Sequence, residues 1–283
     1  MLKPSLAMLT LLGLACAGAA TAPPGMAASP RSEVDARLTL PAPTTSHHYI
    51  ANVGSATRAV KRIGFTVIDT GSSREEIRAL PKGTQALVWL GEECPSHIDP
   101  AFRRQVHRLA KSPRVFGYYL SDEPNDVACP DGPTALATRA RYIRRQSHHA
   151  QQSFIVLSGG YHRYRPQVTG VSMTGIDPYP CSTAHPTCAF GKIKEKVSAA
   201  RRAGIPRDEI VPVYEAFGQE NTASHYYNQP TADQMRTMLE KWAALVPHPP
   251  MDYAYGWGHQ DSANPTLRDS QPLKDLFGTY FAG

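Results

Sequence analysis

The stretch Val115-Phe-Gly-Tyr-Tyr-Leu-Ser-Asp-Glu-Pro124 decides how the chain is interpreted. Its apolar and aromatic residues favour a β-strand, and Pro124 ends that strand because proline cannot donate a ladder hydrogen bond. Two adjacent carboxylates, Asp122 and Glu123, therefore stand at the end of a buried strand. Burying a charge costs free energy unless the group is hydrogen-bonded or used, so chemistry is expected here first.

Strand-forming runs and amphipathic helical segments alternate on both sides of this stretch. Further strands are predicted at 48–53, 65–70, 85–91, 153–158, 171–176, 209–217 and 251–258. Helices are predicted at 55–63, from 72 onward, and at 100–111, 134–149, 190–203, 231–246 and 273–281, whereas 160–169 shows no helical periodicity. This order predicts an α/β fold, a (β/α)8 TIM barrel, with an open doubly wound sheet as the alternative. No glycine-rich phosphate fingerprint follows a strand, which argues against a nucleotide-binding sheet.

The first residues have the pattern of an export signal. Residues 1–22 combine a basic start, an apolar segment too short to span a bilayer, and small residues suited to cleavage. Residues 23–45, rich in Pro, Ala, Ser and Thr, are predicted to be a disordered leader, and 46–283 to be the single barrel domain. We expect a secreted protein, with a lipoprotein anchor through Cys16 as the alternative.

Four cysteines follow the predicted signal peptide: Cys94, Cys129, Cys181 and Cys188. An even number in an exported protein favours two disulfides. Cys181 and Cys188 flank a short loop and are expected to pair, which leaves Cys94 for Cys129. Neither pair has the spacing of zinc ligands, so no metal and no cofactor is expected.

The formal net charge is +6, and the Lys and Arg residues are spread mainly over the predicted helices. This basic character is interpreted as a solvated surface, with polyanion binding as the alternative. We expect a monomer that binds a carbohydrate substrate and no nucleic acid, without a transmembrane segment.

Polar and aromatic side chains gather at the carboxyl ends of the predicted strands, where barrel enzymes place their chemistry. The candidate substrate-binding residues are Asp69, Trp89, Asp122, Asp177, Tyr179, Tyr255 and Trp257. The aromatic rings also fit core packing, although Trp257, between two glycines, favours a ring on an open rim. Asp177, before Pro178, either caps a turn or binds a hydroxyl group.

Two glutamates are the candidate catalytic residues. Glu123 follows the fourth predicted strand and Glu215 lies near the end of the seventh. Glycoside hydrolysis needs two carboxyl groups that flank one bond, and these strand ends lie across the rim of a barrel. The alternatives are structural, namely a helix-capping or Arg-paired Glu123 and a buried ion-pair partner at Glu215.

This arrangement resembles the retaining glycoside hydrolase clan with a (β/α)8 barrel and catalytic glutamates on strands four and seven. The resemblance implies that Glu123 is the acid/base and Glu215 the nucleophile. It matches Tyr179 to a tyrosine that hydrogen-bonds the nucleophile, and Trp257 to an aromatic platform under the sugar. Asp122 departs from the pattern, since the clan usually has asparagine there, and a second carboxylate raises the proton affinity of one of the pair.

We therefore expect a hydrolase that cleaves O-glycosidic bonds of a poly- or oligosaccharide by a retaining double displacement, with the two carboxyls about 5 Å apart. The alternative is a non-catalytic carbohydrate-binding barrel of glycosidase ancestry. A chitinase-like mechanism, in which the substrate's acetamido group is the nucleophile, needs an aspartate two residues before the glutamate. Ser121 occupies that position.

Overall fold

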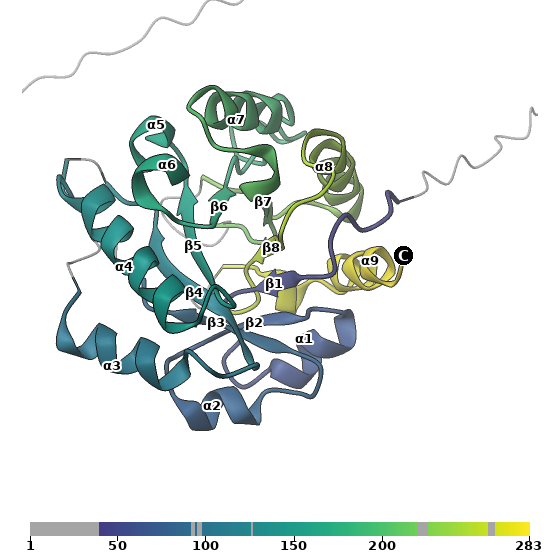
Figure 1. Cartoon of the computed structure of the whole chain (residues 1–283). Helices are drawn as coiled ribbons and strands as arrows, with labels where there is room; N and C mark the ends of the chain where they lie inside the picture. Colours follow the sequence, from purple (N-terminus) through teal and green to yellow (C-terminus); the bar gives the residue numbers. More distant parts are fainter. Residues whose placement is uncertain (1–39, 92–93, 95–97, 126, 220–225, 260–263) are drawn as a thin grey trace, which may run out of the picture. The chain divides into compact units, whose positions relative to one another are not determined.

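The computed structural model describes residues 40–91, 94, 98–125, 127–219, 226–259 and 264–283. Within these ranges, parallel strands pair in sequence order and close into an eight-stranded barrel through pairing of β8 with β1 (Figure 1). The strands are β1 His48–Ile50, β2 Val67–Thr70, β3 Gln85–Trp89, β4 Val115–Asp122, β5 Gln152–Leu157, β6 Met173–Ile176, β7 Ile210–Glu215 and β8 Asp252–Tyr255. The predicted (β/α)8 barrel is confirmed, and closure excludes the open doubly wound sheet.

Helices surround the barrel on its outer side (Figure 1). They are α1 Thr57–Ile63, α2 Arg74–Ala79, α3 Pro100–Leu109, α4 Gly132–Gln146, α5 Tyr161–Tyr164, α6 Pro166–Thr169, α7 Gly191–Arg202, α8 Ala232–Leu245 and α9 Gln271–Ala282, with 3₁₀ turns η1 Arg207–Glu209 and η2 Leu267–Asp269. No helix in the described ranges has the length and apolar character needed to cross a bilayer. The predicted signal peptide and residues 23–39 of the predicted leader lie outside the described residues.

The segment between β5 and β6 differs from the sequence prediction. No helix was expected in 160–169, yet two helices of four residues each, α5 and α6, connect the strands there. Gly160 and Gly170 adopt left-handed φ angles of 62° at the two ends of the segment, and Pro166 begins α6. Helices of a single turn are too short to show a 3.6-residue period, so the pattern could not reveal them.

Two apolar layers form the core. Side chains alternate along each strand, so Tyr49 faces the barrel interior while Ile50 packs outward against the helices. Inside, the rings of Tyr49, Tyr119, Phe154 and Tyr253 pack together, with centroids 4.5 Å apart for Tyr49–Tyr253 and 4.7 Å for Tyr119–Phe154. Because side chains fill the interior, a ligand can bind at an end of the barrel but cannot pass through it.

A buried ion pair joins the first and last strands where the barrel closes. Nδ1 of His48 lies 3.0 and 2.9 Å from the two carboxylate oxygens of Asp252, which has no exposed surface. Burial raises the pKa of Asp252, whereas the charge and hydrogen bond of His48 lower it. The His48 ring also stacks on Phe281 of α9 at 3.9 Å. One histidine thus links β1, β8 and the C-terminal helix.

We expect His48→Leu to lower the free energy of unfolding by about 3–5 kcal/mol, because it leaves the carboxyl group of Asp252 buried without its histidine partner. Asp233→Ala is the control, since Asp233 pairs with Arg236 at 2.7 Å but its side chain is 90% exposed. Such a surface pair contributes about 1 kcal/mol or less. Chemical denaturation measures both. Equal, small losses in the two variants would contradict a structural role for the buried pair.

Candidate functional site

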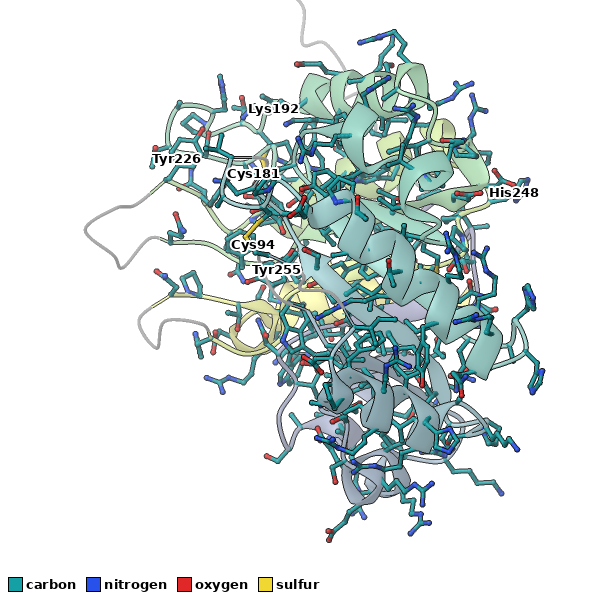
Figure 2. The ribbon with its side chains drawn as sticks, turned by 60° about the vertical axis from the view of Figure 1, so that its left-hand side comes forward. Cys94, Cys181, Lys192, Tyr226, His248 and Tyr255 are labelled. Carbon is teal, nitrogen blue, oxygen red and sulfur yellow. A yellow bond between two sulfur atoms is a disulfide. The ribbon has the colours of Figure 1, made fainter. Side chains whose placement is uncertain are left out.

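The carboxyl ends of the strands bring several of the sequence-predicted residues together. Asp122 ends β4 and Glu123 follows it, Asp177 follows β6, Glu215 ends β7 and Tyr255 ends β8. In Figure 2, Tyr255, Cys94 and Cys181 lie towards one end of the molecule, and His248, which precedes β8, lies at the opposite end. We call the following residues the mouth: Asp122, Glu123, Asp177, Tyr179, Glu215, Phe217, Tyr227 and Tyr255.

Two carboxyl groups, Asp177 and Glu123, interact in the mouth. Asp177 is only 4% exposed, whereas Glu123 is exposed. Burial raises the pKa of Asp177 well above its usual range, and the neighbouring carboxyl groups of Glu123 and then Asp122 raise it further. The raised pKa favours the protonated form of Asp177 beside the Glu123 carboxyl group. Oδ1 of Asp177 has no hydrogen-bond partner among the described residues.

The backbone at Glu123 is in a conformation that side chains rarely adopt. Its φ angle is 43°, in the left-handed region, and its amide donates to the carbonyl of Val156 on β5 at 3.0 Å. Tyr179, two residues beyond Asp177, has a φ angle of 36°. Strained residues of this kind persist only where the surrounding structure holds them, and they cluster at functional sites. The strain at Glu123 and Tyr179 therefore supports a functional assignment for this end of the barrel.

Asp122 is held by the barrel interior. The hydroxyl of Tyr119 donates to its Oδ1 at 2.7 Å. Burial raises the pKa of Asp122, the Tyr119 hydrogen bond lowers it, and the charge of Glu123 raises it. The ring of Trp89 lies against Tyr119 with centroids 4.7 Å apart and is 45% exposed. Trp89 is thus a surface ring next to the residue that orients Asp122, as a substrate-binding role would require.

Glu215 is fully buried, and its Oε2 accepts a hydrogen bond from the backbone amide of Cys181 at 2.8 Å. A backbone donor of this kind favours the ionised carboxylate. The pKa of Tyr227 is raised to about 12, first by burial and then by the charges of Glu123, Tyr226, Glu215 and Asp177. One half-buried ring is therefore within electrostatic reach of three carboxyl groups that come from β4, β6 and β7.

Four half-buried rings form one wall of the mouth. The centroid of Tyr179 lies 5.1 Å from that of Phe217 and 5.5 Å from that of Tyr227. Phe217 lies 5.2 Å from Tyr255 and 5.4 Å from Tyr227. Sequence reasoning missed Phe217 and Tyr227. Phe217 ended a predicted strand without an assigned role, and Tyr227 stands in a segment with no periodicity, so no sequence signal pointed to either ring.

Two of the predicted substrate-binding residues have other environments. Trp257 is 6% exposed, packs in the outer apolar layer and lines a groove between α1 and α9, and no ring contact joins it to the mouth within the described residues. Both oxygens of Asp69 accept backbone amides, from Asn52 at 2.9 Å and Val53 at 3.1 Å. Asp69 thus fixes the turn after β1. The structure does not bring Trp257 to the wall of the mouth formed by Tyr179, Phe217, Tyr227 and Tyr255.

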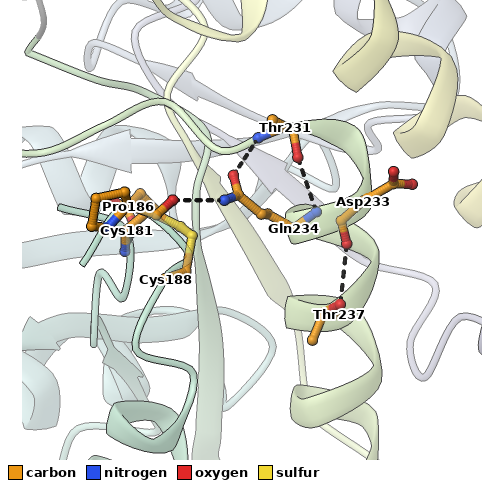
Figure 3. The surroundings of a disulfide bond; sticks show 8 residues. Cys181, Pro186, Cys188, Thr231, Asp233, Gln234 and Thr237 are labelled. Atoms are coloured by element: carbon orange, nitrogen blue, oxygen red, sulfur yellow. Dashed lines mark hydrogen bonds between the residues drawn. A yellow bond between two sulfur atoms is a disulfide. The ribbon is translucent and has the colours of Figure 1, made fainter. Parts of the chain in front are cut away.

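The predicted disulfides Cys94–Cys129 and Cys181–Cys188 are both present. The loop closed by Cys181 and Cys188 is also tied to its neighbours by backbone hydrogen bonds, from Thr183 to Tyr226 and from Asn228 to Cys181. The side-chain amide of Gln234, at the start of α8, donates to the carbonyl of Pro186 at 3.0 Å (Figure 3). The loop therefore holds both the amide that binds Glu215 and the segment that carries Tyr227.

We expect the double substitution Cys181→Ala and Cys188→Ala to lower the free energy of unfolding by about 2–3 kcal/mol, the chain-entropy effect of a short disulfide loop. Denaturant titration of the oxidised protein measures this loss. A change below about 0.5 kcal/mol would show that the backbone hydrogen bonds alone order the loop.

Comparisons with known proteins identify relatives by fold only. No protein-family model matches the chain, and a search of curated proteins finds no match. A GH128 endo-β-1,3-glucanase from Amycolatopsis mediterranei, solved with laminaripentaose, is 12% identical with a TM-score of 0.55, covering 83% of this chain and 99% of its own. A GH18 chitinase from Flavobacterium johnsoniae is 10% identical with a TM-score of 0.52, covering 83% and 92%. A chitinase-like agglutinin from Robinia pseudoacacia is 11% identical with a TM-score of 0.51, covering 83% and 99%.

Proposed function

We propose that the protein is a glycoside hydrolase that binds its sugar at the mouth and uses Glu123 as the general acid. The observation that carries this proposal is the placement of exposed Glu123 beside buried Asp177, whose pKa is raised by burial and by the Glu123 carboxyl group. A general acid site has to hold a proton near the working pH and still reach the substrate. A buried carboxyl group with a raised pKa next to an exposed carboxyl group supplies both.

The surroundings of Glu123 favour this role over a structural one. Among the described residues, Glu123 and Asp177 form no ion pair with a lysine, arginine or histidine. The charges that act on Asp177 are those of Glu123 and Asp122. A carboxyl pair without a cation binds its proton tightly, since ionising both groups places two negative charges together. The described residues therefore give no support to an Arg-paired Glu123.

We assign Glu215 as the nucleophile of a retaining double displacement. Glu123 would protonate the glycosidic oxygen while Glu215 attacks the anomeric carbon, and Glu123 would then take a proton from the water that releases the sugar. The Cys181 amide donates to Oε2 of Glu215 and so orients the carboxyl group that would attack. Because no part of Glu215 is exposed, the groups that cover it have to move when the sugar enters.

In this proposal the sugar-binding surface consists of Trp89 and the four rings of the mouth, Tyr179, Phe217, Tyr227 and Tyr255. Half-exposed aromatic rings offer apolar faces to the C–H groups of a sugar, while their hydroxyls and the carboxylates bind its hydroxyl groups. Support comes from the structural neighbours, which are glycoside hydrolases and a lectin. The glucanase was also solved with each of two glutamates substituted, and their separation along its chain is close to that between Glu123 and Glu215.

A non-catalytic carbohydrate-binding barrel is the second candidate, because one neighbour is a chitinase-like agglutinin. The two candidates differ in what they require of Glu123. Binding of a neutral sugar needs hydrogen-bonding groups but no proton donor matched to the pH, whereas hydrolysis needs both. The buried partner of Glu123 therefore favours the enzyme.

We expect Glu123→Gln and Glu215→Gln each to lower kcat by at least about 10²-fold, the contribution typical of a general acid or base. Glu75→Gln is the control, because Glu75 is exposed on α2. Reducing-end release from a panel of β-glucans, chitin and other polysaccharides identifies the substrate, and NMR of the first product shows whether the anomeric configuration is retained. Measurable binding of a glycan without products, equal in all variants, would favour the binding barrel.

We expect Asp177→Asn to remove one carboxyl titration that lies well above the usual aspartate range. Burial and the neighbouring carboxyl groups of Glu123 and Asp122 raise the pKa of Asp177, so this group keeps its proton at pH values where an ordinary aspartate is ionised. Carboxyl ¹³C NMR titration of the parent protein and the variant measures the change. Asp208→Asn, at an exposed position in η1, should leave the displaced titration in place.

A parent titration in which every carboxyl group titrates within the usual range, or a displaced titration that persists in Asp177→Asn, would contradict the raised pKa of Asp177.

A further inference from the structure

A depression between α2 and α3 has a composition that the proposed function does not use. It has a volume of about 290 Å³ and is lined by Arg74, Ile77, Arg78, Arg108, Leu109, Lys111, Ser112 and Arg114. Five of these residues are cationic and none is acidic. We call Arg74, Arg78, Arg108, Lys111 and Arg114 the basic pocket. Because residues 111–114 immediately precede β4, the pocket lies towards the end of the barrel where strands begin, away from the mouth.

Two of the guanidinium groups are held in place by main-chain carbonyls. Arg74 donates to the carbonyl of Arg108 at 2.8 Å, which links α2 to the end of α3. Arg114 donates to the carbonyls of Leu80 at 2.7 Å and Pro81 at 3.1 Å. Each guanidinium has five N–H donors, so these bonds leave donors unused. Nε of Arg114 is buried and has no partner among the described residues.

Among the described residues, the positive charges of the basic pocket are not balanced by ion pairs. Within the described ranges, none of them forms an ion pair with a carboxylate. Glu76, an acidic residue on α2, accepts a hydrogen bond from the backbone amide of Gly71 instead. Like charges that line one small depression repel each other, and an anion bound among them would turn that repulsion into attraction.

Helix dipoles explain only part of this cluster. Arg78 and Arg108 lie in the last turns of α2 and α3, where a cation interacts favourably with the helix dipole. Arg74 is in the first turn of α2, where the dipole disfavours a cation, and Lys111 and Arg114 lie outside the helices. Arg74 and Arg114 instead donate to carbonyls at the C-terminal ends of α3 and α2, so Lys111 is the positive charge of the five to which neither role applies.

We propose that the basic pocket binds a sulfate or phosphate group. The planar fork of arginine matches the oxygens of a tetrahedral oxyanion, and pre-positioned guanidinium groups lose little freedom on binding. Buried Ile77 and Leu109 line the pocket beside the cations. The oxyanion is either a free ion or a substituent of an anionic polysaccharide. This site is separate from the mouth and does not depend on the proposed hydrolysis.

Calorimetric titration with inorganic sulfate and inorganic phosphate, at an ionic strength held constant with chloride, tests the proposal. We expect saturable binding by the parent protein and at least tenfold weaker binding after Arg78→Gln with Lys111→Gln. Both side chains are exposed, so the double variant should fold, and thermal unfolding verifies this. Arg141→Gln with Lys194→Gln removes the same charge from exposed positions on α4 and α7 and should leave the affinity unchanged.

Equal weakening by the two double variants would overturn the proposal, because it would show attraction to overall charge rather than to a site. Absence of saturable binding for both ions and for dextran sulfate would also overturn it. Dextran sulfate, compared with neutral dextran, distinguishes the two sources of the oxyanion. Tighter binding per sulfate group than inorganic sulfate indicates a polymer-borne group, and equal binding indicates the free ion.

Discussion

Parallel pairing of β8 with β1 is the constraint on which the arrangement of functional groups depends. Once the sheet closes, every strand points the same way and every carboxyl end meets at one rim. Asp177 and Glu123 are far apart along the chain, yet each directly follows the last residue of its strand, and closure brings the two carboxyl groups together. The His48–Asp252 pair lies at the other end of this seam and stabilises it. The pair therefore stabilises the closure that gathers the strand ends at one rim.

The carboxyl pair also explains an apparent mismatch in the sequence around Glu123. A chitinase-like barrel supplies a second carboxyl two residues before the catalytic glutamate, and here Ser121, fully buried, occupies that place. The partner comes instead from β6, as Asp177. A carboxyl group can therefore reach Glu123 from a different strand without a change in the barrel. Asp122, adjacent in sequence, is engaged by Tyr119 and acts on the pair through its charge.

Features that repeat along the sequence were predictable, and features that depend on a meeting of distant side chains were not. All eight strands were predictable from apolar, strand-forming runs that alternate with helical segments. The two disulfides were predictable from the even number of cysteines and the short loop between two of them. The contact between Asp177 and Glu123 could not be read from spacing, because it depends on the direction of each side chain at its strand end. Trp257 was interpreted as an open ring because glycines flank it, but the chain turns its ring towards α1 and α9. Tyr227 reaches the mouth from a long connection that carries no periodic signal.

The net charge does not reveal that carboxyl groups gather at the mouth while cations gather elsewhere. A value of +6 suggests a uniformly basic surface, yet the charges that shift the pKa values of Asp122, Asp177, Tyr179 and Tyr227 are all carboxyl or tyrosine groups. The cations gather elsewhere, five of them in the basic pocket. An anionic sugar would be repelled at the mouth and attracted at the basic pocket. The mouth and the basic pocket therefore differ in the charge they present, and under the proposed function a neutral glycan suits the mouth better than an anionic one.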